Sequence, residues 1–245
     1  MLPGPLLFSH YAFMPNHLGY CGGSDSLALL EYGVSNQVDQ GLIELERQFE
    51  GAYPYLQLIA RANGLADPLD IRVVEAYWIG NDLLDRVDVG ALYASLQERF
   101  RPRTDSRDWF WLASKAPAGA RPHHSFHVLE VYPRVGLMRS GLVDRLVETM
   151  GHCLIRWGRV CTVSGPQLVV EAPALRHESG RLQLTEPRPE MVTRWHAGRG
   201  FVDAAHVGDW VALHWGWACD VLTLRQQASL ERYTRWHLTL CNQTI

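Results

Sequence analysis

Two short segments of the chain carry side chains that could bind a metal ion together. Residues 152–165 (HCLIRWGRVCTVSG) contain Cys153, whose thiolate would be a soft ligand for iron, copper or zinc. Residues 207–222 (VGDWVALHWGWACDVL) contain His214, with the small residues Ala212 and Gly216 two positions away on either side. On a single strand these neighbours share the face of the imidazole and leave it accessible to a ligand. The alternatives are a small buried cysteine and a histidine that is hydrogen-bonded at the rim of a barrel.

A second group of possible metal ligands lies near the start of the chain. His10, His17 and Cys21 are close in sequence, and the run Cys-Gly-Gly-Ser-Asp that begins at Cys21 opens a predicted helix. The backbone N–H groups and the helix N-terminus could lower the pKa of the Cys21 thiol or bind an anion. The alternative is a glycine turn into a capped helix, with the cysteine buried.

A third group is the histidine-rich run PHHSFHVLEVYP. On a helix, His123 and His127 would lie one turn apart and could share a metal ion. On a strand they would be about 13 Å apart, at about 3.3 Å per residue, and could not. The alternating β-branched pattern after His127 favours the strand. The histidines would then be exposed or hydrogen-bonded rather than metal ligands.

Composition restricts the class of protein. The 23 basic and 26 acidic side chains give a net charge of −3, so no overall positive field would attract the chain to nucleic acid or an anionic membrane. The 5 cysteines are odd in number and form no CxxC pair, which excludes a disulfide framework and a four-cysteine zinc ribbon. Polar residues interrupt every apolar stretch well short of the ~18 residues of a membrane span. We therefore expect a soluble, cytoplasmic protein in a reducing compartment.

The elements that position these residues differ between the two parts of the chain. Residues 1–150 are predicted to be mainly helical, and the clearest helix starts at Asp67-Pro68 as N-cap and first helical residue. Leu92, Leu96 and Phe100 continue the helical spacing. Residues 101–122, with their prolines and arginines, predict an irregular loop. A last helix is predicted over residues 142–150.

Residues 151–245 change to short strand-like runs separated by glycine turns, and close with an amphipathic helix from about Leu224. Several short strands at this spacing predict a small β-barrel. The predicted fold class is therefore α+β. It has an N-terminal, mainly helical domain of residues 1–150 and a β-barrel with a C-terminal helix in residues 151–245.

Residues 152–165 and 207–222 resemble motifs of the HypC/HupF hydrogenase maturation chaperones, which are small OB-like β-barrels with a C-terminal helix. The resemblance covers roughly residues 153–240, and the whole chain also looks similar to an uncharacterised bacterial family with this helical-then-β arrangement. The residues that match the two motifs are Cys153, Leu154, Gly158 and Val160, followed by Gly208, Asp209, Val211, His214, Gly216 and Ala218.

This resemblance implies an accessory factor in nickel-iron hydrogenase maturation, which is a metal carrier rather than an enzyme. Its partner would be a HypD-like protein or the precursor of the hydrogenase large subunit, and its cargo an iron with cyanide and carbonyl ligands. Cys153 would supply the thiolate and His214 would lie near the same iron. The family cysteine follows the initiator methionine, whereas Cys153 is internal, and Trp157 stands where the family has proline.

Two other functions compete with the carrier. A metal-dependent enzyme would be centred on the helical domain, with the barrel as a docking module. It requires His10, His17, Cys21 and the group from His123 to His127 to converge on one pocket. A plain interaction protein would use Trp210 and Trp215, beside Gly216, as anchors for its partner, because aromatic residues dominate interface hot spots.

Overall fold

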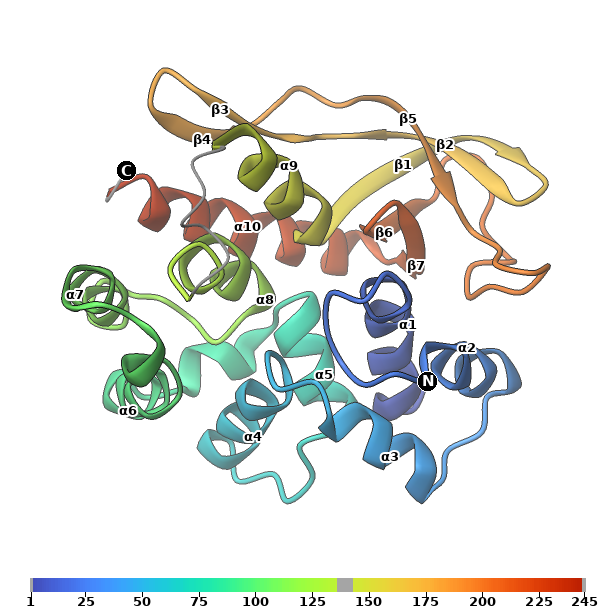
Figure 1. The fold of residues 1–245 in the computed structure, drawn as a ribbon. Helices are drawn as coiled ribbons and strands as arrows, with labels where there is room; N and C mark the ends of the chain where they lie inside the picture. Colours follow the sequence, from blue (N-terminus) through green and yellow to red (C-terminus); the bar gives the residue numbers. More distant parts are fainter. Residues whose placement is uncertain (1, 136–142, 244–245) are drawn as a thin grey trace.

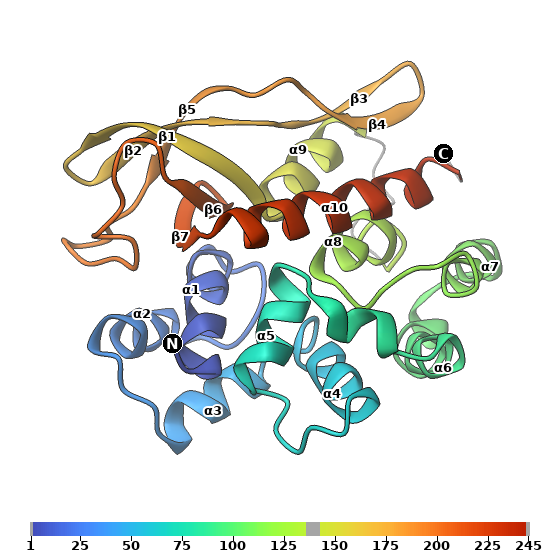
Figure 2. The ribbon, with the colours of Figure 1, turned by 180° about the vertical axis from the view of Figure 1, so that it is seen from behind.

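The fold is α+β, with most helices in one layer and the strands in another, and α9 (Val143–Cys153) lies on the strand side of the C-terminal helix (Figure 1). The computed structural model describes residues 2–135 and 143–243. Figure 1 shows the strands above and an array of helices below, with the long C-terminal helix running between the two layers. Figure 2 shows the same arrangement from behind. No helix in these described ranges is long and apolar enough to cross a membrane.

The helices precede the strands in the chain, except for the last helix. The α-helices are α1 (Gly4–His17), α2 (Ser26–Ser35), α3 (Gln40–Arg47), α4 (Tyr53–Ala62), α5 (Ile71–Trp78), α6 (Val89–Phe100), α7 (Ser106–Lys115), α8 (His124–Phe126), α9 (Val143–Cys153) and α10 (Leu224–Cys241). Short helical segments are η1 (Asp82–Arg86), η2 (Arg101–Arg103) and the π-helix η3 (His127–Val131).

Side-chain caps explain where many of the helices begin. The carboxylates of aspartates accept backbone N–H groups in the first turn, which satisfies donors that have no partner within a helix. Thr223 and Gln226 form a reciprocal capping box at the start of α10. The capping aspartates are Asp25, Asp39, Asp70, Asp88 and Asp105.

Three of the predicted helices are confirmed, and two of the predictions are corrected. The helix through Leu92, Leu96 and Phe100 is α6, and the C-terminal helix is α10. The clearest helix starts later than predicted, because Asp70 caps α5 while the Asp67 carboxylate accepts the N–H of Leu69 in the preceding turn.

The prediction of an irregular loop over residues 101–122 was wrong, because this stretch contains α7. Pro102 lies in η2, and the other two prolines follow α7, so none of them interrupts it. Asp105 supplies the cap. The helix predicted over residues 142–150 corresponds to α9, which extends to Cys153; Leu142 lies outside the described residues.

The strands form a ring of pairings and a separate hairpin. The order β1-β2-β5-β7-β6 closes because β6 also pairs with β1, and β3 pairs only with β4. The ring is weakest between β5 and β7, which share the single parallel pair Thr193↔Trp217. The strands are β1 (Arg156–Ser164), β2 (Gln167–Ala172), β3 (Leu175–Glu178), β4 (Arg181–Leu184), β5 (Arg188–Thr193), β6 (Trp210–His214) and β7 (Trp217–Leu222).

Residues 207–222 do not form the single strand expected from their pattern. They form the hairpin of β6 and β7, in which His214 pairs with Trp217. The two turn residues between them, Trp215 and Gly216, have φ angles of 55° and 71°. Positive φ at both positions is typical of the tight turns that match the twist of a hairpin. The turn places His214 at the end of β6, beside the helical layer.

One apolar core joins the helical layer to the strands. The almost entirely buried α1 contributes Phe8 and Phe13, and the strands contribute Trp217 to the same cluster of side chains. A helix that is apolar on all sides belongs in a core rather than at a surface. The boundary expected after residue 150 falls within α9. That the two regions are separate domains stays a prediction.

Glu46 makes the stability of this core dependent on pH. It is fully buried on α3, near Ser9 of α1, and burial raises the pKa of its carboxyl to about 10. An unfolded glutamate ionises near ~4.3, so the contribution of Glu46 to folding is fully present below that pH and is lost as the pH rises toward its folded pKa. We expect Glu46→Gln to be more stable than wild type at pH 7, by up to about 4 kcal/mol at ~1.4 kcal/mol per pH unit.

Urea unfolding of both proteins from pH 4 to pH 9 measures this difference, which should vanish near pH 4. Glu44→Gln is the matched control, because Glu44 is exposed on the same helix. Parallel pH profiles for wild type and Glu46→Gln would contradict the expectation.

Candidate functional site

Elements from both layers meet at one group of possible metal ligands. His124 begins α8, Cys153 ends α9, and His214 ends β6. One ligand atom from each of these three residues lies within 4.8 Å of the other two. Across the described ranges no other group of three histidine, cysteine or acidic side chains meets this criterion. We refer to His124, Cys153 and His214 as the His-Cys-His group.

The local structure brings these residues together. Only Leu154 and Ile155 separate α9 from β1, and the N–H of Trp215 in the hairpin turn donates to the carbonyl of His152, at 2.9 Å. This bond satisfies one of the carbonyl groups that a helix leaves unpaired at its C-terminus. The turn of the hairpin and the end of α9 are thereby fixed beside each other. Cys153 and His214 are the chain neighbours of the two bonded residues, so the same contact brings them close together.

The geometry of the His-Cys-His group suits a small transition metal ion. The Nε2 atom of His124 lies 4.0 Å from the Sγ atom of Cys153, and the two imidazole centroids are 5.1 Å apart. Metal–nitrogen and metal–sulfur bonds of about 2.0–2.3 Å would place neighbouring ligands roughly 3.5 Å apart. Ligand atoms that lie within 4.8 Å of one another therefore need to close by roughly 1.3 Å at most to hold an ion.

Hydrogen bonds orient both histidines. The Nδ1–H of His214 donates to the carbonyl of Tyr11 at 2.7 Å, while its buried Nε2 has no hydrogen-bond partner in the described structure. His124 lies with Nδ1 at 3.3 Å from the Tyr77 hydroxyl and Nε2 at 2.9 Å from the Cys153 carbonyl. Metal-bound histidines usually hydrogen-bond through the ring nitrogen that does not bind the metal, as His214 does here. To bind an ion through Nε2, His124 would exchange its hydrogen bond to the Cys153 carbonyl for the metal and shift its proton to Nδ1. The unpaired Nε2 of His214 is the observation that fits a metal ion best.

Burial keeps both imidazoles neutral, as a metal ligand requires. It lowers the pKa of His214 to about 4 and places the pKa of His124 well below its ordinary value. Burial raises the pKa of the Cys153 thiol to about 12, and the Trp215 indole beside it opposes this shift. Without an ion the group is therefore uncharged at neutral pH. An ion would displace only the thiol proton.

A partly open, mostly apolar cavity of about 110 Å³ adjoins the group, and all three of its residues line it. Phe49 and Trp78 contribute apolar surface, and Trp215 stacks on Tyr20 at 3.8 Å between ring centroids. We call this space the inner cavity. An ion held by the His-Cys-His group would face it and would be largely shielded from bulk water.

The structure brings together only some of the residues that the sequence proposed as metal ligands. Cys153 and His214 lie in one group, and Cys21 and His127 also line the inner cavity without belonging to that group. His10 instead stacks on Phe201 in the core, and His17 lies beside the Ser26 hydroxyl at an exposed position. An enzyme centred on the helical domain would need all of these residues at one pocket, and His10 and His17 do not line the inner cavity.

His123 and His127 do not share a site, although their segment is helical. The strand expected after His127 was wrong, since α8 continues into the π-helix η3, where the N–H of Tyr132 donates to the carbonyl of His127. His123 lies beside the Ser125 hydroxyl and stacks on Tyr233 of α10. His127 turns toward Tyr55.

His124 is the candidate ligand that the sequence analysis missed. It lay within the predicted histidine-rich group, but only its neighbours were considered as a pair. On a helix His124 points about 100° away from His123, and it faces the β6–β7 hairpin while His123 faces α10. The adjacent pair His123-His124 is the feature of the sequence that could have indicated this residue. The pair alone does not show which of the two histidines faces the strands.

The residues proposed as partner anchors are not freely exposed. Trp210 is half-buried against the main apolar core, and Trp215 is half-buried between Tyr20 and His152. Gly216, beside Trp215, is also half-buried. The tip of the hairpin therefore covers the inner cavity and presents only part of its surface to solvent.

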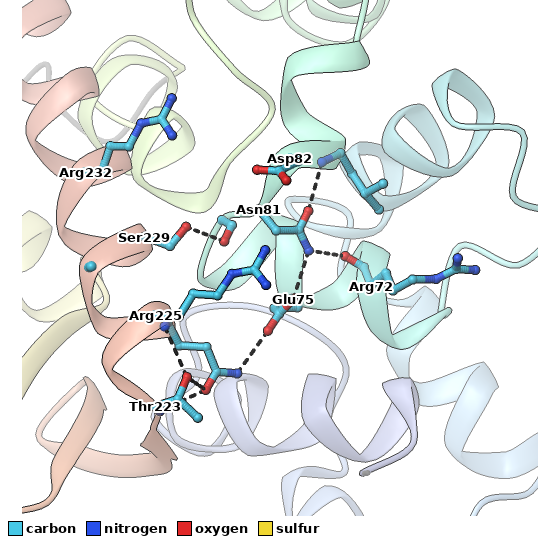
Figure 3. Close-up of a pocket in the computed structure, with 12 residues that line it drawn as sticks. Arg72, Glu75, Asn81, Asp82, Thr223, Arg225, Ser229 and Arg232 are labelled. Carbon is cyan, nitrogen blue, oxygen red and sulfur yellow. Dashed lines mark hydrogen bonds between the residues drawn. The ribbon is translucent and has the colours of Figure 1, made fainter.

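A larger hollow of about 650 Å³ lies between α5, η1 and α10, and Figure 3 shows its lining. Glu75 accepts hydrogen bonds from Asn81 and Gln226, and Ser229 donates to the carbonyl of Gly80. These polar groups pair with one another and dock α10 onto the helical layer. The hollow is therefore a weaker candidate for chemistry than the inner cavity.

Comparison with known proteins gives one match. The model of a protein family described as "Family of unknown function (DUF6390)" matches residues 1–245. No curated protein and no solved structure matches the chain.

Proposed function

The chain belongs to this family along its whole length, and we propose that it is an accessory factor in nickel-iron hydrogenase maturation that carries iron at its His-Cys-His group. The observation that carries the proposal is the meeting of Cys153 and His214. The resemblance to HypC/HupF motifs selects these two residues from distant parts of the sequence. They lie within reach of one metal ion in the fold.

The arrangement of the strands supports the same proposal. A HypC-like, OB-like barrel requires strands whose pairings close into a ring, followed by a C-terminal helix. The order β1-β2-β5-β7-β6 closes in this sense, although only one residue pair joins β5 to β7. Helix α10 follows β7 directly. We propose that these strands serve as the HypC-like module of the protein.

The ligand set is compatible with iron. One thiolate and two neutral imidazoles suit iron, as they suit zinc and copper, and the choice of iron with cyanide and carbonyl ligands comes from the resemblance. The inner cavity would leave room beside the ion for small ligands. In the HypC/HupF pattern the cysteine begins the chain, whereas Cys153 ends α9. His124, from the helical region, would supply a donor that the barrel alone does not contain.

Two proteins are the proposed partners: a HypD-like maturation protein and the precursor of the hydrogenase large subunit. We propose that the protein meets them in the cytoplasm and transfers the iron to them. The β6–β7 hairpin is the proposed contact, because its tip covers the site from which the iron would leave.

Affinity purification from a hydrogenase-producing cell tests this function. We expect wild type to retain a HypD-like protein or the large-subunit precursor, and Cys153→Ala to lose most of that partner and of the bound iron. Cys161→Ala is the matched control, since Cys161 is an exposed cysteine on β1. Infrared bands of cyanide and carbonyl should accompany the wild-type iron. Unchanged hydrogenase activity in a strain that lacks the protein would overturn the proposal.

A further inference from the structure

Two hollows adjoin at the His-Cys-His group. The inner cavity shares part of its wall with a more open recess of about 410 Å³, which we call the outer recess. The outer recess does not include the His-Cys-His group in its lining. The residues common to both hollows are Tyr20, Cys21, Gly51, His127 and Tyr132. A route from the surface to the buried ligands would therefore pass this shared wall.

Cys21 is the soft metal ligand at this wall. It is a free cysteine, and its residue is exposed although it also lines the inner cavity. Cys21 thus lines both hollows. Burial raises the pKa of its thiol well above the ordinary value, so the lowering expected at a helix N-terminus was wrong. His127 is the other nitrogen or sulfur ligand in the shared wall, and its Nδ1 lies 3.5 Å from the Tyr55 hydroxyl. Cys21 is therefore the better placed of the two to meet an ion in the outer recess.

The loop that carries Cys21 is held in place. The amide of Asn16 donates to the carbonyls of Cys21 and Gly23 at 2.7 and 2.6 Å, and the preceding Tyr20 stacks on Trp215. Gly22 has a φ of +81°, and a Cβ atom there would lie 2.4 Å from the Phe49 ring. Only glycine fits this close, left-handed position. The backbone of Cys21 is thus held at the wall between the two hollows.

We infer that Cys21 is the first thiol to bind an incoming metal ion and that it passes the ion to the His-Cys-His group. The inference rests on the metal site of the proposed function. The transfer is a ligand exchange without a redox step. Cys21 loses its proton to solvent when it binds the ion. It regains a proton when the ion moves to Cys153, whose own thiol proton is released.

Binding to Cys21 first would lower the cost of removing water from an ion that enters the buried site. A hydrated ion must shed water before it enters a small apolar cavity, and the loss of hydration is costly without a replacement ligand. A thiolate at the wall replaces part of the hydration shell before the ion reaches the three buried ligands. Cys21 should therefore affect the rate of metal uptake and leave the final affinity nearly unchanged.

Stopped-flow uptake of Co²⁺ by the metal-free full chain tests this inference, with thiolate-to-cobalt absorbance as the signal. We expect Cys21→Ser to take up Co²⁺ about tenfold more slowly than wild type, with an unchanged equilibrium affinity and unchanged final absorbance. Cys161→Ser is the matched control and should keep the wild-type rate, because Cys161 is exposed on β1 and lines neither hollow. Alkylation of Cys21 in the Cys161→Ser protein should slow uptake in the same way without a mutation in the loop.

Each other result overturns the inference. Wild-type uptake rates in Cys21→Ser would remove the role of Cys21 in transfer. A large loss of affinity and of thiolate absorbance in Cys21→Ser would make Cys21 a resident ligand instead. Wild-type protein that binds no Co²⁺ at all would remove the metal site itself. This result would contradict the proposed function itself, and the wild-type protein alone is enough to detect it.

Discussion

Replacing His124 with alanine will weaken Co²⁺ binding by at least ~100-fold, which is the upper end of the loss that follows removal of an outer-shell partner of a metal ligand. The expected loss is this large because His124 would supply one of three protein ligands, and its imidazole is already neutral and oriented in the folded chain. Titration of the metal-free protein with Co²⁺, read by visible absorbance, measures the affinity. Competition with a chelator extends the range for wild type.

Three further variants separate ligation from folding in this experiment. His124→Cys retains a metal-binding side chain and should recover part of the affinity. His177→Ala removes an exposed histidine from β3 and should bind as wild type does. Cys153→Ala should lose the thiolate absorbance altogether. If His124→Ala binds Co²⁺ as tightly as wild type while Cys153→Ala does not, the third ligand comes from another residue.

Lys115→Met should destabilise the fold by about 3–5 kcal/mol, the usual cost of removing one partner from a buried ion pair. The Lys115 ammonium lies 3.0 Å from Glu130 and donates to the carbonyl of Leu240 at 2.6 Å, and both charged side chains are almost completely buried. Burial raises the pKa of Glu130, while Arg134 and Lys115 oppose that shift. Without the ammonium, the buried carboxylate loses one of two cations. Urea unfolding at pH 7 measures the change.

The double variant Lys115→Met/Glu130→Leu distinguishes a buried pair from an ordinary surface pair. Replacing both charged groups with apolar side chains removes the uncompensated charge and should recover most of the lost stability. Arg134→Met should cost less than Lys115→Met, because the Arg134 side chain is less buried. A loss below about 1 kcal/mol for Lys115→Met would mean that the pair behaves as an exposed one.

Local signals in the sequence predicted part of this fold. The spacing of Leu92, Leu96 and Phe100 and the amphipathic pattern after Leu224 predicted α6 and α10, because caps and apolar periodicity act within a few residues. The loop prediction over residues 101–122 failed because its prolines lie outside α7 and therefore do not interrupt it. The signal for the start of α7 is one capping residue, Asp105. The prolines and arginines around it are typical of a loop and outweighed that signal in the prediction.

The candidate site shows a different limit of sequence reasoning. Motif resemblance selected Cys153 and His214, and the structure places them together. The choice of His124 over His123 depends on which side of one helical turn faces the β6–β7 hairpin. That orientation is set by tertiary packing of α8 between α10 and the strands, which a local pattern does not contain. The position of Cys21 at the wall of the inner cavity likewise depends on packing between distant segments.

The long sequence separation within the His-Cys-His group has a consequence for the order of events in folding. The carbonyl of Tyr11 orients His214, and the remaining ligands come from α8 and α9. Contacts between residues far apart in a chain close the longest loops and form late in folding. The ligands can meet only after the helical layer and the strands have docked. A chain that is still being synthesised, or that is only partly folded, would not yet bring the three ligands together and would not bind the metal ion. Bound metal would therefore distinguish fully folded chains from incomplete ones.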